Sequence, residues 1–405
     1  MNCRISGKKL SIVNDFGKQP LGNGFLNKED FDNEFFFNMK TGFCNESKMF
    51  QLIEQPNPKK MFHENYAFFS SSSENMKEHF RNWSNQIIKS IEKKNDPFII
   101  ELGCNDGIFL ENIRDNNIRH LGIEPSANVA QVAKNKDINV ITEFFNANVA
   151  NKIKDQNGKA DYFISANVMC HIPHILDVAK GIELLLNENG ILVFEDPYLG
   201  SVINKTSYDQ IYDEHVYIFS AISVSNIFGA HGFELINLQF QETHGGSMRY
   251  VFAKKGQREI QPIVKKIIEE ERRNKFDDEV TFMKFKEDCE KSKSRLINIL
   301  EDAKKSGKSV AGYGATSKST TILNYCGIGP DLIDFISDTT PIKQNKVTPG
   351  THIPVKSYEY FKDNVPDIII LFAWNHANEI IQKEKNVIDK SVEWITHLPY
   401  FELKI

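Results

Sequence analysis

Apolar residues in this chain gather in short runs, separated by longer stretches where they recur at helical spacing. Residues 76–93 place Phe80, Trp83 and Ile87 on one helical face, which predicts an amphipathic helix. The apolar run 98–102 comes next and indicates a buried parallel strand. This alternation of helix and strand favours an α/β fold.

The same alternation continues through the middle of the chain. We expect a short helix from residue 108, strands at 121–123, 161–166 and 191–195, a helix at 175–186, and an antiparallel pair at 232–238 and 247–253. This order predicts a mostly parallel sheet whose far edge is antiparallel.

The two ends of the chain differ from this middle part. The first 60 or so residues are short segments rich in Gly, Asn and Pro, with β-type pieces at 35–37 and 49–52. Residues 262–304 form a charge-laced helical stretch, which we expect to be broken into two helices. After it, residues 309–315 repeat the strand-then-glycine-loop pattern and a helix is expected at 318–325, followed by strands at 332–336 and 367–373.

We therefore predict an α/β protein of several parts. The expected division is a small loop-rich module at 1–75, a Rossmann-like domain at 76–256, a helical bridge at 257–304 and a second Rossmann-like α/β domain at 305–405.

Composition excludes several classes of protein. A net charge of -5 and a pI of 6.2 lack the basic footprint of a nucleic-acid binder. No apolar run approaches the roughly 20 residues of a membrane span, and the polar amino terminus does not resemble a signal peptide. Six scattered cysteines do not form a disulfide framework. We expect a cytoplasmic protein with no nucleic-acid or membrane partner, as a monomer or small homo-oligomer.

The loop 103–107 and the acid at the end of the next strand carry the first chemical signal. Gly103 and Gly107 allow a sharp turn, and Glu124 is placed to accept both hydroxyls of a ribose. The loop has two glycines rather than three, and Glu101 and Asp106 would repel a pyrophosphate. Acids in this position suit a cationic or zwitterionic nucleoside such as S-adenosylmethionine. The alternative is a plain strand-turn-helix with an incidental glutamate.

The predicted cofactor contacts lie at successive strand ends. Asn167 would lie near the amino-acid end of the cofactor, and Phe144 would either stack on its adenine or belong to the core. The full expected set is Glu101, Gly103, Asn105, Gly107, Glu124, Pro125, Phe144 and Asn167.

Several further motifs occur in a specific order along the chain. They lie at residues 17–23, 66–71, 101–107, 122–125, 167–171, 212–215, 244–247, 313–315 and 349–354. Together they resemble the S-adenosylmethionine-dependent C-methyltransferases of deoxysugar biosynthesis, over nearly the whole chain. The resemblance implies methyl transfer to a carbon beside the ketone of a nucleotide-linked keto-deoxysugar, through an enolate.

Two departures from that family stand out. Members usually bind a structural zinc through paired Cys-x-x-Cys motifs, whereas this chain has Cys3 with Ser6 and Cys44 with Ser47. Serine is a poor zinc ligand, so we expect a module that folds without zinc and no other metal site. The second departure is Phe68, where the family is expected to have a tyrosine near the substrate.

The segment 208–220 is rich in groups for proton transfer. We predict His215 as the general base, with Glu214 either orienting its ring or contacting the sugar. Tyr212 would donate to the enolate oxygen or act as an alternative base. His171, after another strand end, is a second acid or base, or merely packs under its loop.

Substrate contacts are expected around the same crevice. In the last domain, hydroxyls, backbone amides and a lysine after the glycine loop favour a diphosphate handle, unless that domain is a copy of the fold with no ligand. The expected set is Tyr66, Phe68, Tyr198, His244, Gly245, Tyr313, Ser317 and Lys318, with Lys343 and His352 as weaker candidates.

Two rival functions remain at this level. One keeps the cofactor but methylates oxygen or nitrogen of a sugar or related small metabolite. The other makes the chain a non-catalytic nucleotide-binding partner.

Overall fold

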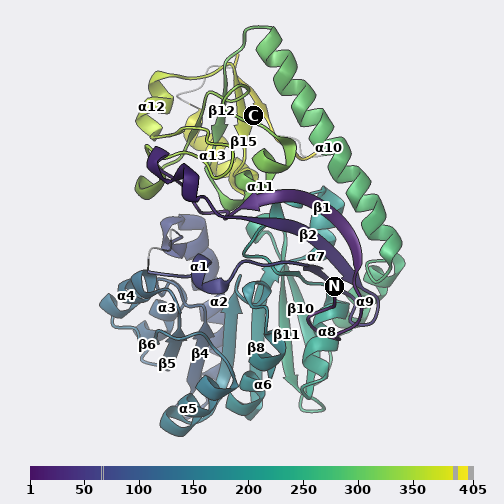
Figure 1. The fold of residues 1–405 in the computed structure, drawn as a ribbon. Coiled ribbons are helices and arrows are strands. Elements are labelled where there is room, and N and C mark those ends of the chain that lie inside the picture. The colour runs from purple at the N-terminus through teal and green to yellow at the C-terminus, as the bar shows by residue number, and fades with distance from the viewer. Residues whose placement is uncertain (65, 67, 386–390, 400–405) are drawn as a thin grey trace.

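Three β sheets organise the molecule. The computed structural model describes residues 1–64, 66, 68–385 and 391–399, which contain one four-stranded, one seven-stranded and one five-stranded sheet. The long strands of the four-stranded sheet cross the middle of the molecule, between the two α/β regions (Figure 1).

The four-stranded sheet is antiparallel and has the order β1-β2-β3-β9. Its strands are β1 (Ser11–Pro20), β2 (Phe36–Cys44), β3 (Met49–Leu52) and β9 (Tyr217–Ile218). Sequence analysis missed β1, because Asn14, Asp15 and Lys18 make the segment locally polar. Pairing with β2 compensates for that polarity: Val13 and Phe16 enter the core while Asp15 stays exposed.

The seven-stranded sheet has the order β10-β11-β8-β7-β4-β5-β6. Its strands are β4 (Phe98–Leu102), β5 (Arg119–Ile123), β6 (Val140–Ile141), β7 (Ala160–Ala166), β8 (Leu186–Pro197), β10 (Phe233–Gln241) and β11 (Ser247–Lys254). The pairs from β8 to β6 are parallel, whereas β11 is antiparallel to both neighbours. The predicted parallel sheet with an antiparallel edge is confirmed.

Helices cover both faces of this sheet. They are α2 (Glu74–Ile91), α3 (Leu110–Asp115), α4 (Ala127–Asn135), α5 (Ala147–Asn157), α6 (Ile175–Leu185), α7 (Leu199–Lys205) and α8 (Ala221–Gly229). Successive residues of β4 point to opposite faces, so Ile99 joins the apolar cluster under α2 and α3 while Ile100 joins the one under α5 and α6. Burial on both faces explains the continuous apolar run of this strand.

The carboxy-terminal sheet is parallel throughout and has the order β14-β13-β12-β15-β16. Its strands are β12 (Val310–Tyr313), β13 (Phe335–Ser337), β14 (Val355–Lys356), β15 (Ile368–Leu371) and β16 (Glu393–Ile395), and its helices are α11 (Ser317–Cys326), α12 (Tyr358–Asp363) and α13 (Ala377–Glu384). The predicted second Rossmann-like region is therefore present.

Two helices connect the α/β regions. The predicted break separates α9 (Pro262–Arg273) from α10 (Glu279–Lys305). Glu271 of α9 accepts hydrogen bonds from the first backbone amides of α8, those of Ala221 and Ile222. In α10, Phe282 packs on Phe43 of β2 with ring centroids 4.4 Å apart. The helix α10 runs along one side of the molecule from the lower region to the upper one (Figure 1).

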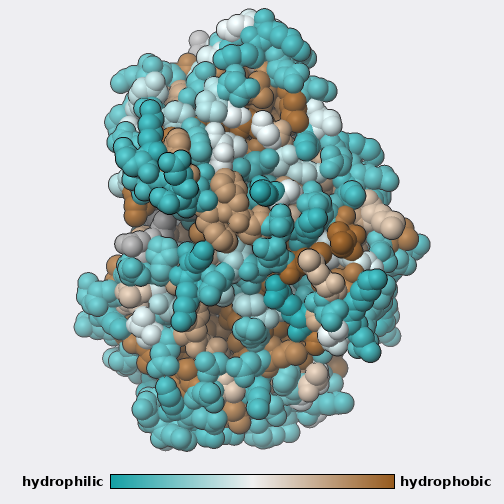
Figure 2. Space-filling view, in the orientation of Figure 1, coloured by the Kyte–Doolittle hydropathy of each residue, from teal (hydrophilic) through white to brown (hydrophobic). Residues whose placement is uncertain are grey.

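The surface gives a simpler picture. Hydrophilic side chains cover most of the face seen in Figure 2, and apolar ones gather in patches around its middle. Within the described part of the chain, no helix combines the length and apolar character that crossing a membrane requires.

Candidate functional site

A cavity of about 1070 Å³ is shared by the amino-terminal, central and carboxy-terminal parts of the chain. Most of the predicted site residues line it. They are Tyr66, Phe68, Gly103, Asn105, Glu124, Pro125, Phe144, Asn167, His171, Tyr212, Glu214, His215, His244, Tyr313, Ser317 and Lys318. The fold thus brings together side chains that lie far apart in the sequence.

At one end of the cavity, Glu124 follows β5 and its carboxylate secures the glycine loop. Oε2 accepts from the backbone amide of Asn105 at 3.1 Å, and Oε1 accepts from the amide of Ser126 at 2.8 Å. Gly103 has φ +72°, and an added Cβ would lie 2.2 Å from a methyl carbon of Val168. A side chain at 103 would therefore meet both backbone strain and a clash.

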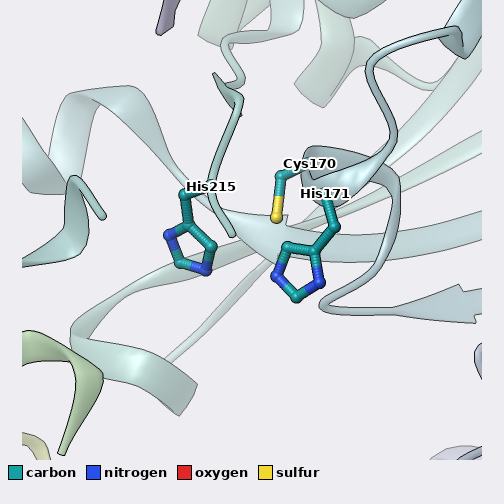
Figure 3. A group of neighbouring side chains, drawn as sticks. All are labelled: Cys170, His171 and His215. Carbon is teal, nitrogen blue, oxygen red and sulfur yellow. The ribbon is translucent and has the colours of Figure 1, made fainter. Parts of the chain in front are cut away.

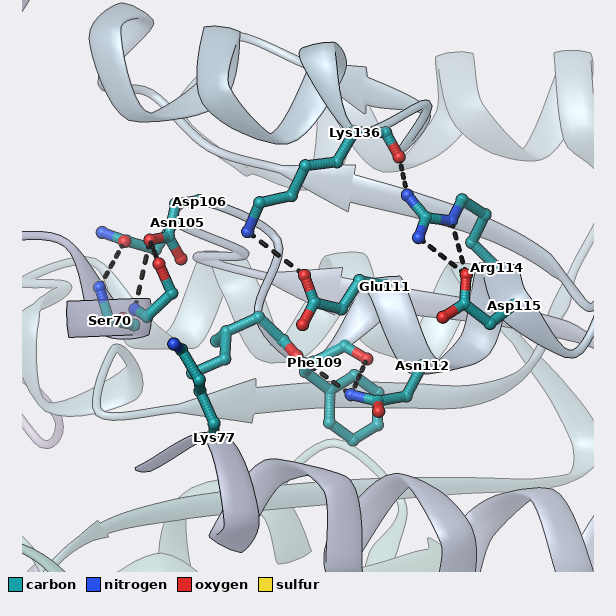
Figure 4. Close-up of polar contacts among 12 residues, drawn as sticks. Ser70, Lys77, Asn105, Asp106, Phe109, Glu111, Asn112, Arg114, Asp115 and Lys136 are labelled. Atoms are coloured by element: carbon teal, nitrogen blue, oxygen red, sulfur yellow. Dashed lines mark hydrogen bonds and ion pairs between the residues drawn. The ribbon is translucent and has the colours of Figure 1, made fainter. Parts of the chain in front are cut away.

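The loop also holds a segment of the amino-terminal part against the sheet (Figure 4). The amide oxygen of Asn105 accepts from the Ser70 backbone at 3.0 Å. Asp106 accepts from the backbone and hydroxyl of Ser71, at 3.1 and 2.5 Å. Asp106 is fully buried by these contacts. Its carboxylate holds Ser71 and does not line the cavity, and the expected repulsion of a pyrophosphate by this acid stays a prediction.

Four other residues of the expected sets lie outside the cavity lining, as does the weaker candidate His352, whose Nε2 lies 2.8 Å from a carboxylate oxygen of Glu34. Glu101 lies beneath the loop, where burial and the charge of Glu124 raise its pKa well above the usual value. Gly107 has φ +82° and packs closely on Ile138. Tyr198 lies beside Glu271 and does not line the cavity. It directly precedes α7, and its ring packs against the core.

The fourth is Gly245, which packs against the ring of Trp374. An added Cβ at Gly245 would lie 2.0 Å from this indole, so the glycine permits contact between the central and carboxy-terminal parts. Its neighbour His244 does line the cavity and has φ +53°, an uncommon conformation for a non-glycine residue.

The groups suited to proton transfer, here called the proton-transfer cluster, line the same cavity and are Tyr212, Glu214, His215 and His171. His215 Nε2 and the Tyr212 hydroxyl are 2.7 Å apart, and His215 Nδ1 is 2.7 Å from the carbonyl oxygen of Gln210. Because a carbonyl only accepts, Nδ1 carries the proton and Nε2 is the acceptor for Tyr212. Gln210, rather than Glu214, orients the ring, and the sequence contained no signal for this backbone contact.

The environment fixes the charges of this cluster. Burial, with a smaller contribution from His171, holds the pKa of His215 well below its ordinary value, so the imidazole is neutral. Burial and the charge of Glu214 raise the pKa of Tyr212 well above the usual range, so the phenol keeps its proton. The pair therefore consists of a neutral acceptor and a neutral donor.

Glu214 has different partners. Its carboxylate accepts from the amide of Asn23 at 2.9 Å and from the hydroxyl of Tyr66 at 3.2 Å. The neighbouring Asp213 accepts from the backbone amide of Gly22 at 3.1 Å. Burial raises the pKa of both carboxyl groups, and the charge of Glu214 raises that of Asp213 further. The sequence motif 17–23 thus contributes directly to the site.

His171 stacks on His215, with ring centroids 5.2 Å apart, and Cys170 lies beside both rings (Figure 3). Ligand atoms of these three residues lie within 4.8 Å of one another. Both nitrogens of His215 already have hydrogen-bond partners, and burial raises the pKa of the Cys170 thiol well above its usual value. This chemistry favours proton transfer over metal binding. Burial also lowers the pKa of His171 to about 3, so this ring is neutral.

The carboxy-terminal part of the chain contributes a cationic group to the cavity lining. Lys318 is 7% exposed and lies over the ring of Trp374, 5.6 Å from its centroid. Asp209 accepts from the Trp374 indole at 2.7 Å and pairs with His397 at 3.1 Å. Sequence analysis missed Asp209, Trp374 and His397, because the three are far apart in the chain and only folding joins them.

In the amino-terminal module, the four positions of the expected zinc motif do converge. Cys3 Sγ lies 3.2 Å from the Ser47 hydroxyl, and Cys44 Sγ lies 3.3 Å from the Ser6 hydroxyl. The donor set is two thiols and two hydroxyls, which does not fit the thiolate and imidazole ligands of a structural zinc site.

Three family models match the chain. Residues 3–62 match a putative zinc-binding domain, residues 74–238 a methyltransferase domain, and residues 242–399 the C-terminal domain of C-methyltransferases. The first match means that the expectation of a zinc-free module has no support from the comparisons, so it stays a prediction.

Individual proteins are also similar. C-methyltransferase NovU of Streptomyces niveus is 32% identical over 402 residues, which cover 98% of this chain and 95% of NovU. A magnesium protoporphyrin IX methyltransferase from Synechocystis PCC 6803, solved with bound S-adenosylmethionine, is 14% identical with a TM-score of 0.33, over 43% of this chain and 79% of that one. The PH0226 protein of Pyrococcus horikoshii OT3 is 13% identical with a TM-score of 0.38, over 47% and 95%. Structural similarity at this level carries no information about substrate.

Proposed function

This chain belongs to the C-methyltransferase family and is an S-adenosylmethionine-dependent methyltransferase, and from this premise we propose that it methylates a carbon beside the ketone of a nucleotide-linked keto-deoxysugar. The observation that carries the proposal is the 2.7 Å contact between His215 Nε2 and the Tyr212 hydroxyl, in the same cavity as Glu124. NovU, whose name gives it as a C-methyltransferase, supports the carbon acceptor.

Carbon methylation needs a nucleophilic carbon, which a ketone provides once a proton leaves the adjacent carbon. His215 is the proposed base. Its Nε2 has a free lone pair when the Tyr212 hydroxyl turns away, and Nδ1 stays bonded to Gln210. A neutral ring can take the proton onto Nε2.

Tyr212 is the proposed donor to the developing oxyanion. A substrate carbonyl would displace Nε2 as the acceptor of its hydroxyl proton, which frees the base at the same moment. His171, stacked on His215, is the second group that can hold a proton. S-adenosylmethionine, when bound, would supply the methyl group to the carbon beside the ketone and leave as S-adenosylhomocysteine.

Other residues would position the two ligands. Glu124 is the proposed partner of the cofactor ribose, as each of its oxygens accepts only one backbone amide and retains a lone pair. Glu214, with Asn23 and Tyr66, is placed to hold a sugar hydroxyl. Lys318 and Ser317 would meet the phosphates.

Hydrogen exchange in D₂O tests the enolate directly. The wild type with S-adenosylhomocysteine should exchange the α-proton of a nucleotide-linked 4-keto-6-deoxysugar without methyl transfer. His215→Asn keeps a donor toward Gln210 but removes Nε2, and it should slow both exchange and turnover by about 10²- to 10⁴-fold. Tyr212→Phe should lower turnover by about 10²-fold.

Binding of S-adenosylhomocysteine should be unchanged in both variants, which is the control for folding. Methyl transfer by the wild type with no detectable α-proton exchange would contradict the enolate and favour an oxygen or nitrogen acceptor.

We also propose that the amino-terminal module is held by the hydrogen bonds of Cys3, Ser6, Cys44 and Ser47 in place of zinc. The double variant S6C/S47C restores four thiols at converging positions and should bind one zinc per chain by elemental analysis. The native protein should bind less than a tenth of that amount, and stoichiometric zinc on it would refute the proposal.

A further inference from the structure

The helix α11 of the carboxy-terminal part packs against the segment that carries Tyr212 and His215. It lies beside β1 (Figure 1) and contacts residues 208–210. Its Thr321 is 2% exposed, and the hydroxyl donates to the carbonyl oxygen of Ile211 at 2.8 Å. A threonine inside a helix commonly donates to the carbonyl four residues earlier in the same helix, so this bond to another segment fixes that segment instead.

Ile211 lies between the residue that orients the proposed base and the proposed donor. The carbonyl oxygen of Gln210, one residue earlier, is 2.7 Å from His215 Nδ1, and Tyr212 follows directly. Consecutive peptide planes are joined by only two soft dihedral angles, so a rotation of the Ile211 carbonyl changes the direction of its neighbours. Thr321 therefore constrains both partners of the 2.7 Å contact between the Tyr212 hydroxyl and His215 Nε2.

A second threonine of α11 reaches the same segment through Gly22. Thr320, also 2% exposed, donates to the carbonyl oxygen of Gly22 at 2.9 Å, and the Gly22 amide donates to Asp213 at 3.1 Å. An added Cβ at Gly22 would lie 2.8 Å from Asp213 Oδ1 and 2.9 Å from Ser317 Cβ. Glycine thus allows the close approach of α11 to the segment 208–215.

Other residues of the carboxy-terminal part contact this segment as well. The Tyr208 hydroxyl lies 3.6 Å from Cys326 Sγ, at the last residue of α11, and Asp209 accepts from the Trp374 indole at 2.7 Å. Positions 208, 209 and 211 are therefore bonded directly to the carboxy-terminal part of the chain.

We propose that Thr321, assisted by Thr320, is a positioning residue for the Tyr212–His215 pair. The inference rests on the proposed function, since it names what holds the proposed base and donor at hydrogen-bond distance. It assigns the carboxy-terminal part a role in proton transfer itself. A displacement of about 1 Å in a catalytic group costs on the order of 100-fold in rate, so the loss of one hydroxyl should be measurable in turnover.

Thr321→Val tests the residue, because it keeps the shape of the side chain and removes the donor to Ile211. Turnover of a nucleotide-linked 4-keto-6-deoxysugar, and exchange of its α-proton in D₂O with S-adenosylhomocysteine, should both fall about 10- to 100-fold. Because Thr321 lies outside the cavity lining, the KM for the sugar and the affinity for S-adenosylhomocysteine should stay within about threefold. Thr321→Ser restores the hydroxyl and should return turnover to within about threefold of the wild type.

Tyr325→Phe is the matched control on the same helix. It removes a hydroxyl that donates to Glu290 at 2.6 Å, which belongs to α10 and not to the segment 208–215. Turnover and exchange should stay within about twofold of the wild type. An equal loss in Tyr325→Phe would assign the effect to loosening of the whole helix and overturn the inference. Wild-type turnover and exchange in Thr321→Val would overturn it too.

Nuclear magnetic resonance of ¹⁵N-labelled histidine reads the geometry without turnover. The wild type should show a slowly exchanging proton on His215 Nδ1, held by the Gln210 carbonyl and identified by its absence in His215→Asn. Thr321→Val should speed the exchange of this proton with water, and an unchanged signal would contradict the positioning role. Should Thr321→Val fail to fold, Thr320→Val and Thr320→Ser repeat the comparison through Gly22, with an expected loss of about 3- to 10-fold in the valine variant alone.

The outcomes separate this inference from the proposed function. Exchange of the α-proton by the wild type, at the same rate in Thr321→Val, would keep the enolate and reject the positioning role. Methyl transfer by the wild type with no α-proton exchange would reject the enolate, while a faster-exchanging His215 proton in Thr321→Val would still support the positioning role.

Discussion

The two glycine loops of this molecule share a backbone design but differ in how the next helix begins. After Gly103, the helix α3 begins only at Leu110 and its first turn has no side-chain cap. After Gly314, α11 begins at Ser317, and Thr316 and Ser319 form a capping box. The first loop is therefore held by residues 70 and 71 and by Glu124, whereas the second combines a local helix cap with a hydrogen bond from the Ala315 amide to Asp338.

The charged side chains near the two glycine loops also differ. Glu101 in β4 and Asp106 in the first loop are both buried, and Glu124 lines the cavity there. Near the second loop, the cavity lining contains the buried Lys318 and also Lys343, whose Nζ lies 3.8 Å from Asp338 Oδ2. The two loops thus share a backbone design with an acid after the next strand, and the neighbouring side chains give the two parts of the cavity a different charge.

The largest effect is expected from a side chain at the first loop. Gly103→Ala places a Cβ 2.2 Å from Val168 at a φ of +72°. Strain and overpacking should together lower the free energy of unfolding by about 3 kcal/mol and abolish S-adenosylhomocysteine binding. Urea denaturation and calorimetry measure both. The double variant Gly103→Ala with Val168→Ala should recover only the packing part, and full recovery would show that the backbone is unstrained.

The next effect concerns Lys318, which follows the second glycine loop. Lys318→Met removes the charge while keeping the length of the side chain, and it should weaken nucleoside diphosphate binding about 10- to 100-fold because a charge-assisted hydrogen bond is lost. Calorimetry should show unchanged S-adenosylhomocysteine affinity. Equal losses for both ligands would mean that Lys318, next to Asp209, serves the fold rather than the anion.

A pH titration sharpens the same contrast. Burial lowers the pKa of Lys318 from its ordinary value to about 8, and the charge of Asp209 offsets part of this shift. The amine is charged below that pH and attracts phosphate, so nucleotide affinity should be constant from pH 7 to the pKa. Above it, affinity should fall by up to about tenfold per pH unit, because binding then requires uptake of a proton. Lys318→Met should lose this dependence, and an identical profile in that variant would assign the titration to another group.

The smallest effect is expected at the helix cap after the second loop. It tests whether this cap or the tertiary contacts hold the loop. Thr316 Oγ1 accepts from the backbone amide of Ser319 at 3.1 Å. Thr316→Ala should lower the free energy of unfolding by about 1 kcal/mol, while Thr316→Ser, which retains the hydroxyl, should cost less than half of that. Urea denaturation compares them. If both variants match the wild type, the cap does not hold the second loop.

Much of the fold could be predicted from sequence because it is encoded locally. The continuous apolar run of β4 reflects burial on both faces, and the break between α9 and α10 reflects the charged stretch that separates them. β1 escaped prediction because its residues are polar, and only pairing with β2 makes it a strand.

Some residues of the candidate site could likewise be predicted from the sequence, and others could not. His215, Tyr212 and Glu124 could be named from motif and position, and they do line one cavity. Tyr198 could not be excluded in advance, since strand-end position fixes where its backbone lies but not which way its side chain turns. Gly245 could not be excluded either, because only the folded chain brings Trp374 against it.

The sequence alone determined the order of strands and helices, the two glycine loops and the chemical groups available, because spacing and residue type act over a few neighbours. Only the tertiary structure decided that Gln210 orients His215, that Asp106 secures Ser71, and that Asp338 shares a cavity with Glu124. Asp106 and Ser71, like Asp338 and Glu124, come from distant segments. Even over the five residues from Gln210 to His215, the direction of a side chain depends on the packing that surrounds it once the chain has folded.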